Sequence, residues 1–143
     1  MKNNKLSRKQ KEEKLLFFAN KHLGKPYKYG ARPWQAPIIF DCSSFVQYLY
    51  KRIDIVLPRV SIEQARYGKK TTKNKLKLGD LIFIKGGTGR YNKYFPEGIG
   101  HVALYAGNGK VIHAEGVKYR KVIEEPLAVF LKRSKVTIIR RYF

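Results

Sequence analysis

The chain has 143 residues and carries 31 Lys and Arg against 10 Asp and Glu, which gives a formal net charge of +21 at pH 7. This length fits one small domain, and a hydrophobic content of 43% supplies enough core to exclude intrinsic disorder. The apolar run behind the basic start, residues 15–19, is too short for a secretory signal, and no stretch approaches the ~20 apolar residues of a membrane span. We therefore expect no export signal and no transmembrane segment. The positive charge favours a polyanionic partner, but it does not choose among nucleic acid, a membrane surface and an acidic wall polymer.

The chain is expected to open with a helix. Ser7 and Gln10 have the spacing of a capping box, and apolar residues at helical spacing predict a helix over residues 7–23. His22 lies on its apolar face and is expected to be a core or rim histidine. The next stretch, 24–37, is rich in Gly, Pro and aromatic residues, a composition typical of a structured loop.

Two further helices are predicted before the composition changes. Asp41 is a good N-terminal residue, and the apolar spacing behind it predicts a helix over residues 41–52. Ser61 and Gln64 repeat the capping-box spacing and predict a short helix over 61–67.

The second half of the chain is rich in β-forming residues. Runs with a period near two occur at 81–85, 101–106, 110–114 and 136–143, and a short helix fits 126–132. Because helices come first and strands follow, the sequence predicts an α+β fold in which the helices pack on one face of an antiparallel sheet of about five strands. We expect residues 1–14 to form a basic N-terminal arm and helix start, and residues 15–143 to form a single domain.

The single cysteine, Cys42, excludes an intrachain disulfide and a four-cysteine zinc site. A lone cysteine is by default a buried hydrophobe. Cys42, however, follows Asp41 in the first turn of a predicted helix, where free backbone N–H groups and the helix dipole favour a thiolate. Its position therefore suits a nucleophile.

A thiol nucleophile needs a base, and the base needs an orienting partner. His101 opens one predicted strand and His113 lies in the next. If residues 107–109 form a three-residue hairpin loop, Ala103 pairs with His113 and the two imidazoles share a face. If the loop has only two residues, His113 faces away and cannot orient His101.

Six short motifs occur in order along the chain: Gly24 Lys25 Pro26 Tyr27 with Tyr29 Gly30; Asp41 Cys42 Ser43; Leu57 Pro58 Arg59 with Gln64; Leu78 Gly79 Asp80 Leu81; Gly100 His101 Val102 with Tyr105 and Gly107; and Ile112 His113 Ala114. Each motif is weak alone, but the ordered set, over roughly residues 15–115, resembles the NlpC family of papain-like cell-wall cysteine peptidases. The resemblance implies a papain-like fold and hydrolysis of peptidoglycan stem peptides, at the bond between D-glutamate and the diamino acid.

The resemblance also implies roles for individual residues. It assigns Cys42 as nucleophile, His101 as base and His113 as the residue that orients His101. The further oxyanion and substrate-binding residues that it implies are Tyr27, Asp41, Ser43 and Gln64.

Two features depart from the family pattern. Ser44 stands where the family usually has Gly after Asp-Cys-Ser, and Ala31 where a second Gly often follows Tyr-x-Gly, so we expect a slightly altered groove. Residues 86–98 form a connection longer than usual, which we expect to shape one wall of the cleft.

Other readings of the same residues remain open. One Cys and two His could hold zinc, but no carboxylate base stands near His101 in the sequence and a thiol at a helix start needs no metal, so no metal and no cofactor are expected. A polyanion-binding module with structural Cys and His, and an acyltransferase or amidase using the same triad, are the alternatives. We expect a monomer that acts at the cell wall or extracellularly on stem peptides, is held near anionic wall polymers by charge, and binds nucleic acid at most non-specifically.

Overall fold

The computed structural model describes residues 5–87 and 92–143, and it has helices on both faces of one antiparallel sheet. The sheet has six strands in the order β1-β6-β2-β3-β4-β5. The strands are β1 Lys69–Thr71, β2 Leu81–Ile84, β3 His101–Tyr105, β4 Lys110–Glu115, β5 Lys121–Pro126 and β6 Val136–Arg141. The helices are α1 Arg8–Lys21, α2 Cys42–Lys51, α3 Ser61–Gln64 and α4 Leu127–Lys132, with single 3-10 turns at Pro33–Gln35 and Lys73–Lys75.

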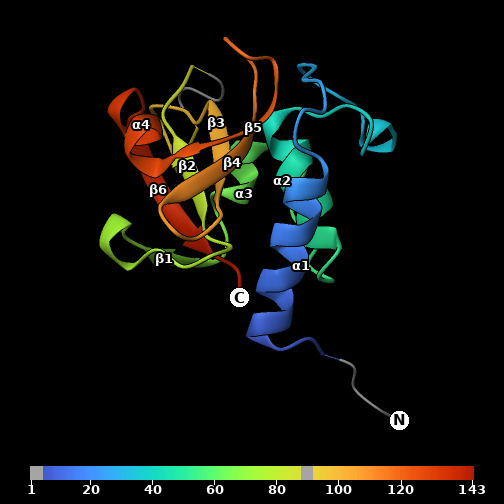
Figure 1. Cartoon of the computed structure of the whole chain (residues 1–143). Helices are drawn as coiled ribbons and strands as arrows, with labels where there is room; N and C mark the ends of the chain where they lie inside the picture. The colour runs from blue at the N-terminus through green and yellow to red at the C-terminus, as the bar shows by residue number, and fades with distance from the viewer. Residues whose placement is uncertain (1–4, 88–91) are drawn as a thin grey trace.

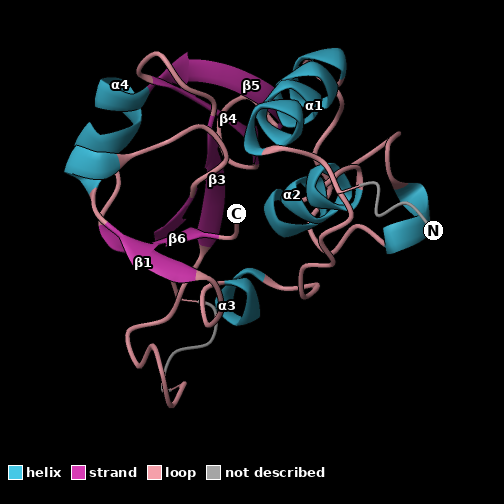
Figure 2. Ribbon diagram, turned by 90° about the horizontal axis from the view of Figure 1, so that it is seen from below, coloured by secondary structure: helices cyan, strands magenta, loops and turns pink. Residues whose placement is uncertain are grey.

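The predicted α+β class is confirmed, and the sheet has one strand more than the expected five. Figure 1 shows α1 and α2 side by side against the sheet, and Figure 2 shows α4 on the opposite side. No helix within 5–87 and 92–143 combines the length and the apolar character that crossing a membrane requires.

Helix α1 begins as the sequence predicts. The Ser7 hydroxyl accepts the backbone N–H of Gln10, and the Gln10 side chain accepts the N–H of Ser7. The helix ends at Lys21, two residues earlier than expected. Its start lies inside the expected arm of residues 1–14, and Arg8 donates to the backbone carbonyl of Phe143, so the start of α1 lies against the C-terminal residue.

Helix α2 is the central helix of the fold. Its apolar face carries Phe45, Val46 and Leu49, which are fully buried against β3 and β4. Burying such side chains contributes roughly 1.5–3 kcal/mol each. The first turn of α2 is therefore held firmly at one end of the sheet.

The short helix α3 differs from its prediction. Val60, not a side-chain cap, precedes it, and Ser61 is its first helical residue, so the capping box expected for Ser61 and Gln64 does not form. The Gln64 side chain turns instead toward the start of α2, and the helix stops at Gln64 rather than at residue 67.

Apolar residues alternate along the central strands and build two cores. One core lies between the sheet and α1 and α2, and includes Phe83, Val102 and Leu104. A smaller core lies under α4 and is centred on Ile82 and Phe130. The expected short helix at 126–132 is thus real, and it covers the second face of the sheet.

Strands β1 and β5 were not predicted as separate strands. β1 reads Lys-Lys-Thr and lies at the sheet edge against β6, and in β5 the adjacent apolar residues Val122 and Ile123 are followed by Glu124 and Glu125. The expected long connection, residues 86–98, falls partly on 88–91, which lie outside the described residues. In its described part, Lys85 and Glu97 form an ion pair with an N–O distance of 3.7 Å.

His22 is buried beside α2 without a hydrogen-bond partner. Its side chain is 4% exposed and packs edge-on against Phe40 and Tyr48, and neither ring nitrogen has a partner among the described residues. Burial, with the nearby charges of Lys25 and Lys21, lowers the pKa of His22 below 6.5. His22 is thus a core histidine, as predicted.

Lowering the pH should therefore destabilise the fold over the pH range in which histidine titrates. All three histidines have a pKa below 6.5 in the folded chain, so below pH 6.5 the unfolded chain binds more protons than the folded chain. The free energy of unfolding therefore decreases as the pH is lowered. Each histidine contributes up to about 1.4 kcal/mol per pH unit. Urea unfolding between pH 7 and 5, above the range where glutamates titrate, should show this loss, and His22→Leu should make it shallower. An unchanged pH dependence in His22→Leu would mean that the pKa of His22 is the same in the folded and the unfolded chain, which would contradict its lowering by burial.

Candidate active site

Cys42 is the first residue of α2 and sits under a complete capping box. The Asp41 carboxylate accepts the Ser44 N–H at 2.8 Å, and the Ser44 hydroxyl accepts the Asp41 N–H at 2.9 Å. Ser44, the departure from the family pattern, thus strengthens the helix start that positions the thiol.

The Cys42 side chain is protonated at neutral pH. Burial, and next the charge of Asp41, raise the pKa of Cys42 to about 11, although backbone N–H groups, that of Val102 among them, favour the thiolate. Val102 directly follows His101, so the thiol lies at the beginning of β3. A thiol in this state needs a base to become a nucleophile.

The hairpin between β3 and β4 has the three-residue form. Leu104 pairs with Ile112 and Tyr105 with Val111, and the Ala106 N–H donates to Lys110 across the loop. This register continues to a pairing of Ala103 with His113. The condition for the two imidazoles to share a face is met: Nε2 of His101 lies 2.7 Å from Nδ1 of His113.

His113 is in turn held by a carboxylate that the sequence reading did not single out. Its Nε2 lies 2.6 Å from a carboxylate oxygen of Glu125 on β5, and Glu125 is paired with Arg133 from the end of α4. Although burial opposes it, the hydrogen bonds from Arg133 and His113 keep the pKa of Glu125 below its usual value. Glu125 is therefore an ionised acceptor at neutral pH.

The ionised carboxylate determines the tautomers of both rings. Burial lowers the pKa of His113, and burial together with His113 lowers the pKa of His101 to about 3, so both rings are neutral at pH 7. Since Glu125 can only accept, His113 must donate from Nε2, and its Nδ1 must accept the Nε2–H of His101. The remaining lone pair of His101 is then on Nδ1.

The same spacing argues against zinc between the two rings. A zinc ion needs about 2.0–2.1 Å to each nitrogen, whereas the nitrogens of His101 and His113 are only 2.7 Å apart, which is a hydrogen bond. Within residues 5–87 and 92–143, no three His, Cys, Asp or Glu side chains form a metal-binding group.

Tyr27 lines the same cleft as the two histidines. The cleft has a volume of about 660 Å³, and its lining includes Tyr27, His101, His113 and Glu125. Burial, then the charges of Cys42 and Asp41, raise the pKa of Tyr27 to about 12, so its phenol keeps its proton and can donate a hydrogen bond. Tyr27 therefore lies near both the Cys42 thiol and the cleft that the two histidines line.

Arg59 holds Asp41 and Ser43, two of the residues that the resemblance assigns to the oxyanion and substrate site. Its guanidinium pairs with the Asp41 carboxylate at 2.8 Å, donates to the Ser43 hydroxyl at 2.9 Å, and reaches the backbone carbonyl of Ala31. Asp41 and Ser43 are 7% and 5% exposed. The Asp41 carboxylate and the Ser43 hydroxyl therefore already interact with Arg59. Arg59 belongs to the motif at residues 57–59, but the resemblance assigns it no role.

Gln64 is not on the surface of the cleft. Its side chain is fully buried, and its amide donates to the carbonyls of Ser43 and Pro58. In this position Gln64 hydrogen-bonds to the first turn of α2 and is not accessible to a substrate.

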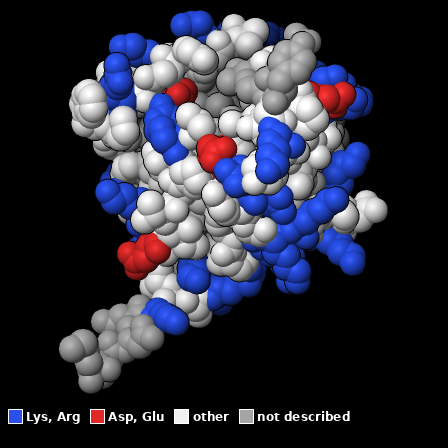
Figure 3. Space-filling model, turned by 180° about the vertical axis from the view of Figure 1, so that it is seen from behind, with Lys and Arg blue, Asp and Glu red and all other residues white. Residues whose placement is uncertain are grey.

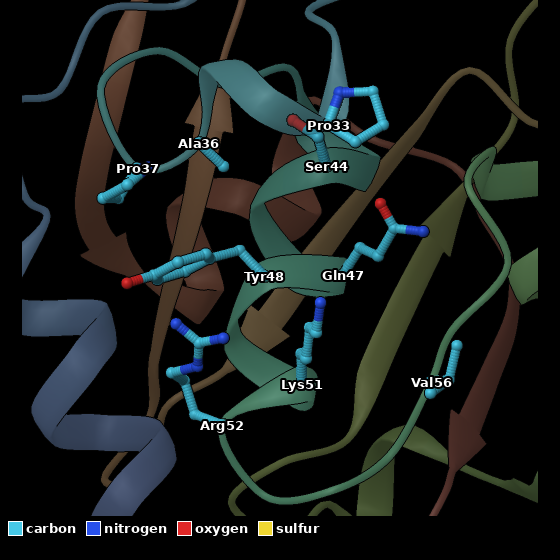
Figure 4. Close-up of a pocket in the computed structure, with 9 residues that line it drawn as sticks. All are labelled: Pro33, Ala36, Pro37, Ser44, Gln47, Tyr48, Lys51, Arg52 and Val56. Carbon is cyan, nitrogen blue, oxygen red and sulfur yellow. The ribbon is translucent and has the colours of Figure 1, made fainter.

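A second pocket, of about 490 Å³, lies on the outer side of α2 (Figure 4). It is formed by Pro33, Ala36 and Pro37 from the loop facing Tyr48 and Arg52 from the helix. None of the sequence-predicted site residues lines it. It is therefore separate from the cleft that holds the histidines.

Comparisons with known proteins identify the family of this chain. Residues 24–140 match the model of the NlpC/P60 family. The chain is 38% identical over 110 residues to a probable endopeptidase p60 of Listeria innocua, covering 76% of this chain and 21% of that protein. It is 33% identical over 126 residues to a gamma-DL-glutamyl hydrolase of Bacillus subtilis, covering 87% and 28%.

A solved structure shows the same fold. The peptidoglycan hydrolase RipB of Mycobacterium tuberculosis superposes with a TM-score of 0.72 at 28% identity, covering 95% of this chain and 68% of that chain. The fold is thus the papain-like α+β fold that the sequence predicts, and the chain belongs to the NlpC/P60 family. It spans about a fifth of the length of the p60 proteins that it matches.

The Tyr27 ring depends on a glycine. A Cβ on Gly116 would lie 2.5 Å from Cζ of Tyr27, which is closer than atoms can approach, whereas a Cβ on Gly87 would meet nothing within 4 Å. Gly116→Ala should therefore lower the free energy of unfolding by about 1–3 kcal/mol through overpacking. Gly87→Ala should change it by less than about 0.5 kcal/mol. Urea unfolding at pH 7 measures both, and equal stabilities would show that the ring does not rest on Gly116.

Proposed function

We propose that this chain is a cysteine peptidase that hydrolyses an amide bond in the stem peptides of peptidoglycan. The observation that carries the proposal is the hydrogen-bonded series from Glu125 through His113 to His101. His101 lines a cleft, and the Cys42 thiol hydrogen-bonds to the backbone of Val102, the next residue along β3. Membership of the NlpC/P60 family supplies the substrate class. The names of three relatives, an endopeptidase and two hydrolases, are consistent with this class.

Catalysis begins with proton transfer from Cys42 to His101. The tautomers set by Glu125 leave the lone pair of His101 on Nδ1, which takes the thiol proton as the sulfur attacks the amide carbonyl. A C–S bond forms, and the carbonyl π electrons move to the oxygen. The imidazolium that results is stabilised through His113 by the ionised Glu125.

The developing oxyanion needs donors that are already in place. The free N–H groups at the start of α2 and the Tyr27 phenol, which keeps its proton at neutral pH, supply them. His101 then gives its proton to the leaving amine as the C–N bond breaks. Water, deprotonated by His101, hydrolyses the thioacyl enzyme and regenerates the thiol.

The bond that we propose is the one between D-glutamate and the diamino acid. Asp41, although paired with Arg59, carries a carboxylate near the thiol and provides an anionic site for the free amine of a trimmed stem peptide. The name of the Bacillus subtilis relative, a gamma-DL-glutamyl hydrolase, is consistent with cleavage after a glutamyl residue. The net charge of +21 would hold the enzyme near an anionic wall by salt-sensitive attraction.

The first test is digestion of soluble muropeptides and purified peptidoglycan, read by mass spectrometry. Wild type should release new stem-peptide fragments whose masses identify the bond, and Cys42→Ala should release none because the nucleophile is missing. Fragments from Cys42→Ala would contradict the mechanism. In another outcome, the wild type cleaves no muropeptide and yet is alkylated at Cys42 faster than a free thiol at the same pH. This pair of results would favour the acyltransferase or amidase alternative.

The role of Glu125 can be tested against its neighbour on the same strand. Gln at position 125 can donate to Nε2 of His113, which would reverse both tautomers and put the His101 proton on Nδ1. We therefore expect Glu125→Gln to lower kcat on a soluble muropeptide by about 10²-fold or more with little change in KM. The control is Glu124→Gln, whose carboxylate pairs with Lys110 on the surface, and it should stay within about twofold. Equal kcat values for the two variants would remove Glu125 from the mechanism.

A further inference from the structure

A separate basic groove lies where β1 and the turn after it face the end of α4 and β6. It has a volume of about 420 Å³. We call it the β1–β6 groove and define it by Lys70, Thr71, Lys73, Ser134, Lys135 and Thr137. Of its lining residues, only Ser134 also lines the catalytic cleft, so the two hollows adjoin without coinciding.

The two segments that build this groove carry no acidic residue. Residues 64–79 contain six Lys and Arg, residues 126–143 contain five, and neither contains Asp or Glu. Figure 3, the view from behind, shows Lys and Arg gathered toward the lower right. Because this view is turned by 180° about the vertical axis, β1, which lies at the left of Figure 1, lies on the right-hand side of Figure 3. About a third of the Lys and Arg of the chain thus lie on these two segments, and the acidic residues that pair with some of their arginines, Glu63, Asp80 and Glu125, lie outside them.

The lysines of the groove are free to bind an anion. Lys70, Lys73 and Lys135 are exposed, and within residues 5–87 and 92–143 none of them forms an ion pair with a carboxylate. The arginines of the same segments are engaged: Arg133 pairs with Glu125 and Arg141 with Asp80. The groove therefore presents ammonium groups, which bind single phosphate charges without demanding bidentate geometry.

The lining also distinguishes between kinds of phosphate polymer. Sites for single-stranded nucleic acid combine a basic groove with aromatic side chains on which bases stack. No residue that lines the β1–β6 groove, all of them within the described chain, is aromatic, and its polar side chains are hydroxyls and lysines. Hydroxyls can donate to phosphate oxygens or bond to polyol hydroxyls.

We propose that the β1–β6 groove binds a linear polyol phosphate, an anionic polymer with one phosphodiester per repeat and no bases. The lysines bind successive phosphates, and the hydroxyls of Thr71, Ser134 and Thr137 bond to the polymer between them. Because the groove adjoins the catalytic cleft at Ser134, a polymer bound in the groove would hold the catalytic cleft close to the cell surface or wall to which that polymer is attached. The proposal concerns binding alone and does not depend on the proposed peptidase activity.

The test compares two triple variants of equal charge. Lys70→Gln, Lys73→Gln and Lys135→Gln together remove the groove cations. Lys9→Gln, Lys14→Gln and Lys51→Gln together remove three exposed lysines from α1 and α2, which pack on the other core. Both proteins have a net charge of +18, and thermal melting shows whether each keeps the fold.

Binding of a defined glycerol-phosphate oligomer is measured by fluorescence anisotropy at several salt concentrations. The groove triple should bind at least tenfold more weakly than wild type, and its plot of log Kd against log salt should be shallower by about two, since each of the three lysine–phosphate contacts contributes about 0.7 to the slope. The control triple should stay within about threefold of wild type. An oligothymidylate with the same number of phosphates should bind wild type more weakly than the glycerol-phosphate oligomer.

Two results would overturn the proposal. If both triples lose affinity equally, the net charge and not the groove binds the polymer. If the oligothymidylate binds as tightly as the glycerol-phosphate oligomer and loses affinity in the groove triple, the groove is a general phosphate or nucleic-acid site.

Discussion

The hydrogen bond between His101 and His113 is the interaction on which the site depends. At 2.7 Å between Nε2 and Nδ1 it fixes one ring against the other, but its direction is not set by the two rings themselves. The direction comes from Glu125, an ionised acceptor that forces His113 to donate outward. Because Arg133 pairs with Glu125, an ion pair in the same cleft determines which nitrogen of His101 can act as a base.

The fold is arranged so that this interaction can exist. β3, β4 and β5 are consecutive neighbours in the sheet, so His101, His113 and Glu125 come from three adjacent strands whose register is fixed by backbone pairing. Helix α2 approaches from the other core and brings Cys42 to the start of β3. Burial then keeps the imidazoles and the thiol neutral, so the charge separation occurs only when a substrate is attacked.

The sequence predicted the parts whose signals are local. The capping residues Ser7 and Asp41 and the Cys42 helix start lie within short segments, and each is found as expected. The sequence left the loop between His101 and His113 open between two and three residues, and the structure has the three-residue form. Glu125 was missed because its importance depends on β5, a strand with two adjacent glutamates and little β-forming character that is held by pairing with β4. β1, which reads Lys-Lys-Thr, was missed for the same reason, since its partner is at the far end of the chain. Gln64 was expected at the substrate, yet its burial follows from the way α3 packs under α2, which no local pattern shows.

The central claim is that both rings carry their proton on Nε2 in the resting protein. It is tested most directly by NMR of the chain labelled with ¹⁵N-histidine at pH 7, with His22→Leu used to assign the third ring. The account predicts that His101 and His113 are both neutral Nε2–H tautomers with an unprotonated Nδ1. A His101 that is protonated on Nδ1, or is an imidazolium at this pH, would contradict it.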